Sequence, residues 1–232
     1  MTPDFDTDIA SDHLRLDLTS WENAYVVGDV HGCADALERL LSTLEVTGDD
    51  LVVFVGDLIR KGPESGRVVR RVRESENMFS VRGNNEEKVL RGEKALQSLD
   101  ASDIEWLRSL PVAISWNGGL VVHGGVDPRR PLAEHTVDQL QNTRSLDPDG
   151  GYDGPFWYEQ YERSPRVFFG HTVLESPIET RSAVGLDTGC VYGGSLTAYD
   201  LREDRFYDVP ARRPGRSRSE SKIVSPTTKS KP

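Results

Sequence analysis

Residues 24–32 read AYVVGDVHG, a short apolar run that ends in a turn rich in glycine and polar side chains. Leucines follow at positions 37, 40, 41 and 44, the spacing of one helix face. The same order occurs twice more: residues 51–55 lead into GDLIRKGP at 56–63, and residues 79–81 lead into RGNNE at 82–86. Three successive strand, turn and helix units predict a largely parallel sheet, with all three polar turns at the carboxyl edge of its strands.

The pattern changes after residue 99. Residues 100–110 predict a capped helix, and Asn-Gly-Gly at 117–119 between two apolar runs predicts a β-hairpin. The second hairpin strand leads into His123, and a further strand at 167–169 leads into His171. We expect residues 127–165 to form loop and cap over the site, with one helical patch at 137–140.

The carboxyl-terminal part contains three more short apolar runs, around 184–186, 196–199 and 206–209. We expect these runs to be antiparallel strands that close a second sheet. The predicted fold is a sheet-on-sheet α/β sandwich.

Charge is distributed unevenly along the 232 residues, which carry a net charge of −10. Residues 211–232 hold seven Arg or Lys and a single acid, Glu220, so the body of the chain carries −16. An acidic body argues against broad nucleic-acid binding, because a phosphate backbone needs a cationic surface. Its low lysine content suits a high-salt environment.

Other compositional features set the expected location and domain plan. No apolar run approaches the ~18 residues of a membrane span, and the amino terminus lacks a secretory pattern, so we expect a cytoplasmic protein without membrane attachment. Cys33 and Cys190 are expected to be free thiols. We divide the chain into an amino-terminal extension (1–22), one domain (23–210) and a disordered basic tail (211–232).

Five polar clusters follow strand-like runs: Asp29 with His31, Asp57, Asn84, His123 and His171. Carboxylate, imidazole and amide groups are ligands for divalent ions such as Mn²⁺, Fe or Zn²⁺. Each cluster alone is more often turn chemistry or a structural histidine, but three of the five histidines occur in this pattern. The other two, His13 and His135, are expected at the surface.

Together these motifs resemble the calcineurin-like metallophosphoesterases. Within that superfamily they are similar to the phosphoprotein-phosphatase branch and the relatives of symmetrical diadenosine tetraphosphatase. GLDTGCVYGGSLTA at 185–198 is similar to the carboxyl-terminal signature of the latter. The resemblance covers residues 24–209 and implies the metallophosphoesterase fold, an α/β four-layer-type sandwich of two mixed β-sheets flanked by helices.

The resemblance also implies roles for individual residues. Asp29, His31 and Asp57 would bind one divalent ion, and Asp57, Asn84, His123 and His171 a second, with Mn²⁺ expected and Fe or Zn²⁺ as alternatives. Lys61 would bind phosphate. A lysine at the start of a helix opposes the helix dipole unless an anion lies between them, which also favours a phosphate there. Arg144 matches the second phosphate-binding arginine of the family, with a plain surface arginine as the alternative.

Two positions depart from the family pattern. The third motif of the family has a histidine that protonates the leaving oxygen, and this chain has Asn85 there, which cannot act as an acid. The acidic residue that orients this histidine is replaced by Arg60. All the metal positions are retained.

The expected function is therefore a metal-dependent hydrolase of phosphomonoesters or phosphoanhydrides, acting on a phosphoprotein, nucleotide or polyphosphate through a hydroxide that bridges two ions. Leaving groups such as nucleotide phosphates need the least acid catalysis. The alternative is a catalytically impaired metal- and phosphate-binding module that senses a phosphorylated ligand. In a third, purely structural reading, the motifs serve packing alone.

Overall fold

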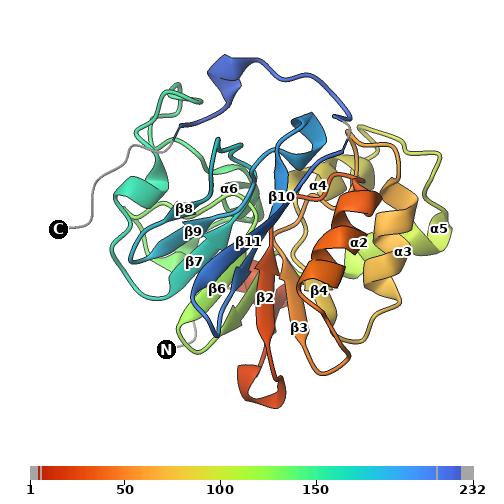
Figure 1. The fold of residues 1–232 in the computed structure, drawn as a ribbon. Helices are drawn as coiled ribbons and strands as arrows, with labels where there is room; N and C mark the ends of the chain where they lie inside the picture. Colours follow the sequence, from red (N-terminus) through yellow and green to blue (C-terminus); the bar gives the residue numbers. More distant parts are fainter. Residues whose placement is uncertain (1–4, 6, 213, 226–232) are drawn as a thin grey trace.

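Three parallel strands form the centre of the first sheet in the computed structural model, which describes residues 5, 7–212 and 214–225. They are β2 (Ala24–Val27), β3 (Leu51–Phe54) and β4 (Met78–Ser80), connected by α2 (Ala34–Thr43) and α3 (Ser65–Arg73) (Figure 1). β10 (Ser195–Asp200) and β11 (Arg205–Pro210) extend this sheet, giving the order β11-β10-β2-β3-β4. The predicted parallel strand and helix units are confirmed.

The second sheet has six strands in the order β1-β5-β6-β7-β9-β8. They are β1 (His13–Arg15), β5 (Ala113–Trp116), β6 (Gly119–Val122), β7 (Arg166–Phe169), β8 (Ile178–Glu179) and β9 (Ala183–Gly185). β5 and β6 form the predicted antiparallel hairpin, while β6, β7 and β9 run parallel. Both sheets are therefore mixed, as predicted.

The prediction that the late runs are antiparallel strands of a second sheet is right for the antiparallel pairing of β10 with β11 and wrong for the sheet that these two strands join. The run at 184–186 falls in β9, which pairs parallel with β7, while β10 and β11 join the first sheet. β10 pairs antiparallel with β2, and its side chains alternate between two cores, with Ala198 facing the helices and Tyr199 facing the other sheet. A short apolar run indicates a strand but does not specify its partner, which depends on contacts far away in the sequence.

Short helices complete the chain. The α-helices are α1 (Thr7–Ala10), α4 (Asn84–Leu90), α5 (Ala101–Ser109) and α6 (Val137–Asn142), and the 3-10 helices are η1 (Leu18–Ser20), η2 (Leu132–Glu134), η3 (Trp157–Glu159), η4 (Cys190–Tyr192) and η5 (Glu220–Lys222). Asp100 caps α5 by accepting a hydrogen bond from the backbone N–H of Asp103, as expected for a capped helix. No helix in the described part of the chain is long and apolar enough to span a membrane.

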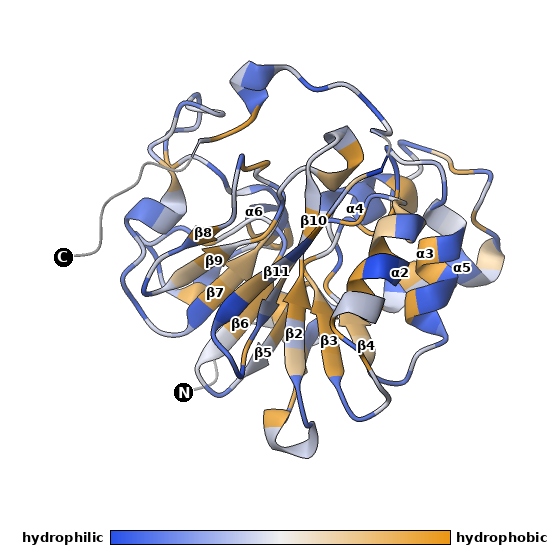
Figure 2. Cartoon of the chain, viewed as in Figure 1, coloured by the Kyte–Doolittle hydropathy of each residue, from blue (hydrophilic) through white to orange (hydrophobic). Residues whose placement is uncertain are grey.

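Three hydrophobic cores separate the layers. One lies between the first sheet and α2, α3 and α5, a second lies between the two sheets, and a third covers the outer face of the second sheet beneath α6 and residues 146–161. In β2, Tyr25 and Val27 face the helices, and Ala24 and Val26 face the other sheet. Figure 2 shows the strands mostly in hydrophobic colours, whereas α2 and α3 carry hydrophilic bands. This is the predicted four-layer α/β sandwich.

The described residues near the amino terminus pack against the second sheet. Phe5 and Ile9 are buried in its outer core, and β1 pairs parallel with β5. Residues 211, 212 and 214–225 differ from the expected disordered tail: Gly215 donates a backbone hydrogen bond to Val191, and Val224 is buried beside Leu174. The sequence reading missed this docking because the basic residues outnumber the apolar residues that anchor the segment. Residues 1–4, 6, 213 and 226–232 lie outside the described residues.

The two histidines expected at the surface are not surface residues. His135 is buried, and its Nε2 accepts a hydrogen bond of 2.7 Å from the backbone N–H of Asp127. His13 lies in β1, half-buried, with its Nε2 2.8 Å from Ser115 Oγ. Both positions sit in polar sequence surroundings, so neither shows the apolar periodicity that would have predicted burial. Cys33 and Cys190 are free thiols, as predicted.

Candidate metal and phosphate site

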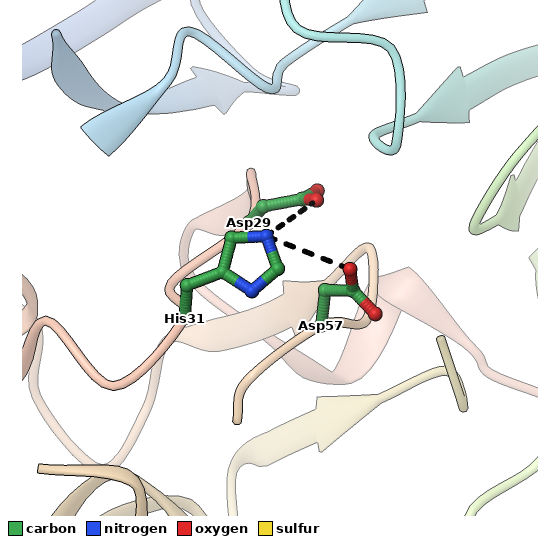
Figure 3. A group of neighbouring side chains, drawn as sticks. All are labelled: Asp29, His31 and Asp57. Carbon is green, nitrogen blue, oxygen red and sulfur yellow. Dashed lines mark ion pairs between the residues drawn. The ribbon is translucent and has the colours of Figure 1, made fainter. Parts of the chain in front are cut away.

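Asp29, His31 and Asp57 come together at the carboxyl edge of the first sheet, where β2 and β3 end (Figure 3). All three side chains are buried, and one ligand atom from each lies within 4.8 Å of the others. His31 Nε2 is 3.7 Å from Asp29 Oδ2 and 3.5 Å from Asp57 Oδ2. These are the three residues that the resemblance assigned to the first ion.

The other oxygen of Asp57 faces a second histidine. Asp57 Oδ1 is 3.4 Å from Nε2 of His123, which follows β6 in the other sheet. The Nδ1 atoms of His31 and His123 lie 3.1 and 2.8 Å from the backbone oxygens of Ile59 and Val55. A carbonyl oxygen only accepts, so Nδ1 carries a proton in each ring, and Nε2 is the ring atom that faces Asp57. Such a hydrogen bond from the second ring nitrogen is usual for histidines that bind a metal.

Asn84 and His171 form the far side of the site. Asn84 is the first residue of α4, and its Nδ2 lies 3.2 Å from His171 Nδ1 and 3.0 Å from Asn142 Oδ1. His171 follows β7, and its backbone N–H is 3.3 Å from both carboxylate oxygens of Asp29. The structure thus brings together all six residues expected to bind metal.

The local backbone is unusual. Among the described residues, seven other than glycine have a positive φ, and five of them belong to this site: His31, Asp57, Arg60, Lys61 and His171. A positive φ costs free energy for such residues, and clusters of this kind occur mainly at functional sites.

Buried charge defines the electrostatics of the site. Burial, together with the charges of Asp187 and Asp57, raises the pKa of Asp29 well above its usual value. Burial and the nearby Lys61 ammonium lower the pKa of His31 to about 4, so this ring is neutral at pH 7. Burial also lowers the pKa of His171, with help from His123 and Arg144. Burial lowers the pKa of His123, but the Asp57 carboxylate outweighs burial and raises this pKa to about 9. A divalent ion binds neutral imidazoles and ionised carboxylates, so its binding would displace protons from this set.

The residues present fit a divalent ion. His123 Nε2 is buried without a hydrogen-bond partner and points at a carboxylate. Buried carboxylates are costly unless they are paired or bound to a cation, and three of them, Asp29, Asp57 and Asp187, interact here. The mixed oxygen and nitrogen ligands suit Mn²⁺, Fe or Zn²⁺.

The role of Glu86 was not predicted from the sequence, although Glu86 belongs to the motif at 82–86. Glu86 is fully buried and accepts hydrogen bonds from the backbone N–H groups of Asp57, Ile59 and Gly83. It thereby ties the loop after β3 to the start of α4 and positions Asp57. Burial and the charge of Asp57 raise the pKa of Glu86 to about 7. Its place at the third helical position of α4 was the available signal, because a glutamate there can form a capping box.

The two cations expected to bind phosphate lie on opposite sides of the cluster. Lys61 Nζ is 2.6 Å from His31 Nε2 and lies over the ring of Tyr192. Arg144 Nη2 is 3.4 Å from the backbone oxygen of His171. Both side chains are only partly exposed, and each lies beside a histidine of the cluster.

The two residues that depart from the family pattern contact each other. Arg60 Nη1 donates a hydrogen bond to Asn85 Oδ1. Asn85 Nδ2 donates to Asp57 Oδ2 and to Asn84 Oδ1. Asn85 therefore lies within the ligand cluster and not at its edge.

A family model described as calcineurin-like phosphoesterase matches residues 23–209. The chain belongs to this family. It is 26% identical to the asymmetrical bis(5'-nucleosyl)-tetraphosphatase PrpE of Oceanobacillus iheyensis, over 82% of this chain and 92% of the relative. It is 28% identical to the symmetrical bis(5'-nucleosyl)-tetraphosphatase of Bordetella pertussis, over 82% and 96%.

A solved structure agrees with these relatives. A protein described as "a putative diadenosine tetraphosphatase" is 31% identical and superposes with a TM-score of 0.78, over 86% of this chain and 97% of that one. The protein is thus a phosphoesterase of the calcineurin-like family, with a group of buried residues able to hold a divalent ion.

Proposed function

We propose that this phosphoesterase is a dinuclear-metal hydrolase of phosphoanhydrides, with dinucleoside polyphosphates as its substrate class. The observation that carries the proposal is the position of Asp57, whose two carboxylate oxygens face different histidines, His31 and His123. A carboxylate between two sets of ligands is the arrangement needed to share two ions.

The proposed ligands are Asp29, His31 and Asp57 for one ion and Asp57, Asn84, His123 and His171 for the other, with Mn²⁺ as the expected metal. Two such ions, when bound, supply Lewis-acid polarisation of the phosphoryl group and a water of lowered pKa as the nucleophile. Glu86 keeps Asp57 in place through its three backbone hydrogen bonds. The buried Asp29 and Asp57 carboxylates offset the charge of the ions.

Lys61 and Arg144 are proposed to bind the non-bridging oxygens of the reacting phosphate. Each lies directly beside a histidine of the cluster, one on each side. Cations fixed before the reaction stabilise the charge that develops on phosphate oxygens, at no reorganisation cost. Arg144 can contact two oxygens at once because its guanidinium presents a planar fork of donors.

Asn85 favours an anhydride over an ester as the substrate. Its amide cannot protonate a leaving oxygen, and its neighbour is the Arg60 guanidinium where the family pattern has an acid. A nucleotide phosphate departs as a weak base and needs little protonation, whereas a serine or sugar alkoxide needs much. The names of the relatives from Oceanobacillus and Bordetella support the same substrate class.

Phosphate release by the purified chain tests the proposal. We expect turnover of diadenosine tetraphosphate with Mn²⁺, loss of turnover with a chelator, and slower hydrolysis of a phosphoserine peptide. p-Nitrophenyl phosphate, an ester with a good leaving group, should also react. No release from any of the three substrates with Mn²⁺, Mg²⁺ or Zn²⁺ would contradict the proposal.

The second candidate, a module that binds metal and phosphate without turnover, is favoured by a single observation, the replacement of the general acid by Asn85. It predicts tight, stoichiometric binding of diadenosine tetraphosphate with no product after prolonged incubation. Calorimetry and product analysis on one sample separate the two candidates.

A further inference from the structure

Cations and tyrosine rings alternate in an arc over the metal ligands. Lys61 Nζ lies 5.5 Å from the ring centre of Tyr192, and the Arg218 guanidinium lies 4.8 Å from the same ring. Arg218 also lies 5.3 Å from the ring centre of Tyr152. The Arg144 guanidinium lies 4.1 Å from the same ring centre. The arc thus begins at His31, beside Lys61, and ends at His171, beside Arg144.

Arg218 comes from the segment that the sequence suggested was disordered. Residues 214–225, here called the C-terminal strap, cross the top of the molecule from the side of α2 and α3 to the loops around α6 (Figure 1). The backbone of the strap is attached at both ends, by Gly215 to Val191 and by Val224 to Val173. The strap therefore carries Arg218 over the carboxyl edge of both sheets.

The side chain of Arg218 is held by two phenols. Its Nη1 donates to the Tyr192 hydroxyl at 3.0 Å and its Nη2 to the Tyr152 hydroxyl at 2.6 Å. Its Nε donates to the backbone oxygen of Lys222 at 2.8 Å. All three acceptors are hydroxyl or carbonyl oxygens and none is a carboxylate, so the guanidinium is oriented without an ion pair.

The charge balance of the arc is unusual for this chain. Many arginines of this chain form ion pairs with Asp or Glu. Among the described residues, Lys61, Arg144 and Arg218 form no such ion pair. Two of these cations come from the body of net charge −16 and one from the basic tail, and they gather here with no described carboxylate at ion-pair distance, which indicates an anionic ligand. Lys61 and Arg144 suffice for one phosphate, which leaves Arg218 for another.

We propose that Arg218, positioned by Tyr152 and Tyr192, forms a subsite for the phosphate chain beyond the scissile phosphate. The ligand class is a linear polyphosphate, free or esterified to nucleosides. The proposal rests on the proposed function and deepens it: the strap makes the site selective for substrates with several phosphates over simple monoesters. Tyr152 and Tyr192 are positioning residues that hold the guanidinium.

Arg218→Ala is the central test, with Arg216→Ala as the matched control, because Arg216 lies exposed on the same strap and joins the fold through its backbone. We expect Arg218→Ala to lower kcat/KM for diadenosine tetraphosphate about tenfold or more, mainly through KM, as a charge-assisted contact warrants. The rate on p-nitrophenyl phosphate should stay within about twofold. Tyr152→Phe and Tyr192→Phe keep the rings but remove the acceptors, and should give smaller losses in the same direction.

Binding of inorganic tripolyphosphate, measured by calorimetry at saturating Mn²⁺, tests the subsite without turnover. Affinity for tripolyphosphate should fall about tenfold in Arg218→Ala and stay unchanged in Arg216→Ala, with orthophosphate binding equal in all forms. Equal losses on diadenosine tetraphosphate and p-nitrophenyl phosphate, or unchanged tripolyphosphate affinity, would overturn the subsite. If no substrate is turned over, the proposed function fails, but the calorimetry still decides the role of Arg218.

Discussion

The guanidinium of Arg60 donates a hydrogen bond to the side-chain oxygen of Asn85, whose amide in turn donates to the Asp57 carboxylate. The family pattern has an acid and a histidine at these two positions, so both members of the pair differ together. The contacts here run from a guanidinium through an amide to a metal-ligand candidate, and neither the guanidinium nor the amide is a general acid. The pair can hold Asp57 in place but cannot protonate a leaving group.

Asn85→His is expected to raise the rate on alkyl phosphates more than the rate on p-nitrophenyl phosphate or diadenosine tetraphosphate. General acid catalysis is worth ~10²–10⁴-fold, and poor leaving groups gain most from it. The gain should be below this range while Arg60 remains, because its charge disfavours an imidazolium and lowers the pKa of the new histidine.

Arg60→Asp combined with Asn85→His should exceed the product of the two single rate changes, because the two new side chains act as one unit. Rates across a series of leaving groups, with metal content checked for each variant, measure this. Equal or lower rates in every variant at full metal content would mean that another donor already serves the leaving group.

Asp57→Asn should remove metal and activity together. Asn tolerates the left-handed backbone found here, where Asp57 has a φ of 52°, so the fold should survive. Loss of a residue that only orients a metal ligand lowers metal affinity or activity about 10–100-fold, and loss of a shared ligand should lower them further. Metal analysis and phosphate release on the same preparation test this. Full metal content and wild-type rate would show that Asp57 is only a turn residue.

Gly170→Ala should disturb the site without altering a metal ligand. A Cβ at residue 170 would lie 2.0 Å from Asp29 Oδ1, so the carboxylate must move. We expect weaker Mn²⁺ binding, measured by calorimetry. Gly48→Ala is the matched control, because nothing lies within 4 Å of its Cβ. Identical Mn²⁺ affinity in both variants would mean that the position of Asp29 does not matter for the ion.

His135 should make the protein less stable in acid. Burial lowers its pKa below the value of 6.5 for an exposed histidine. The stabilising contribution is thus present above pH 6.5 and is lost as the pH falls through the folded-state pKa, where protonation removes the acceptor of the Asp127 N–H. In His135→Gln, the free energy of unfolding should fall less steeply between pH 7 and 5 than in the wild type. The difference between the two slopes should be up to about 1.4 kcal/mol per pH unit. An unchanged slope would contradict this.

The sequence predicted those parts of the site that local patterns encode. Asp29, Asp57 and Asn84 each follow an apolar run, and parallel strands deliver such residues to one edge, so their proximity followed from the pattern alone. The partner strand of β10 and the burial of His135 could not be predicted from the pattern, because both depend on contacts between segments that are distant in the sequence. The same holds for Glu86, because two of its three hydrogen bonds reach back to the loop after β3.

The C-terminal strap shows the other limit of sequence reasoning. Its composition of Arg, Ser, Pro and Lys is that of a disordered segment, and only Val224 is deeply buried. Arg218 is oriented by single hydroxyl groups on Tyr152 and Tyr192, and such pairings leave no periodic signal along the chain. The strap and its contacts were therefore visible only in three dimensions.

The ligands of the site come from both sheets, and this has a consequence for biosynthesis. The contact between His171 and Asp29 joins residues 142 positions apart, and that between His171 and Asn84 joins residues 87 apart. A nascent chain therefore cannot assemble the complete ligand set until His171 has left the ribosome and both sheets have docked. An ion that binds only this docked state stabilises the completed fold but does not nucleate folding. A chelator should therefore weaken the packing of the two sheets against each other before either sheet unfolds.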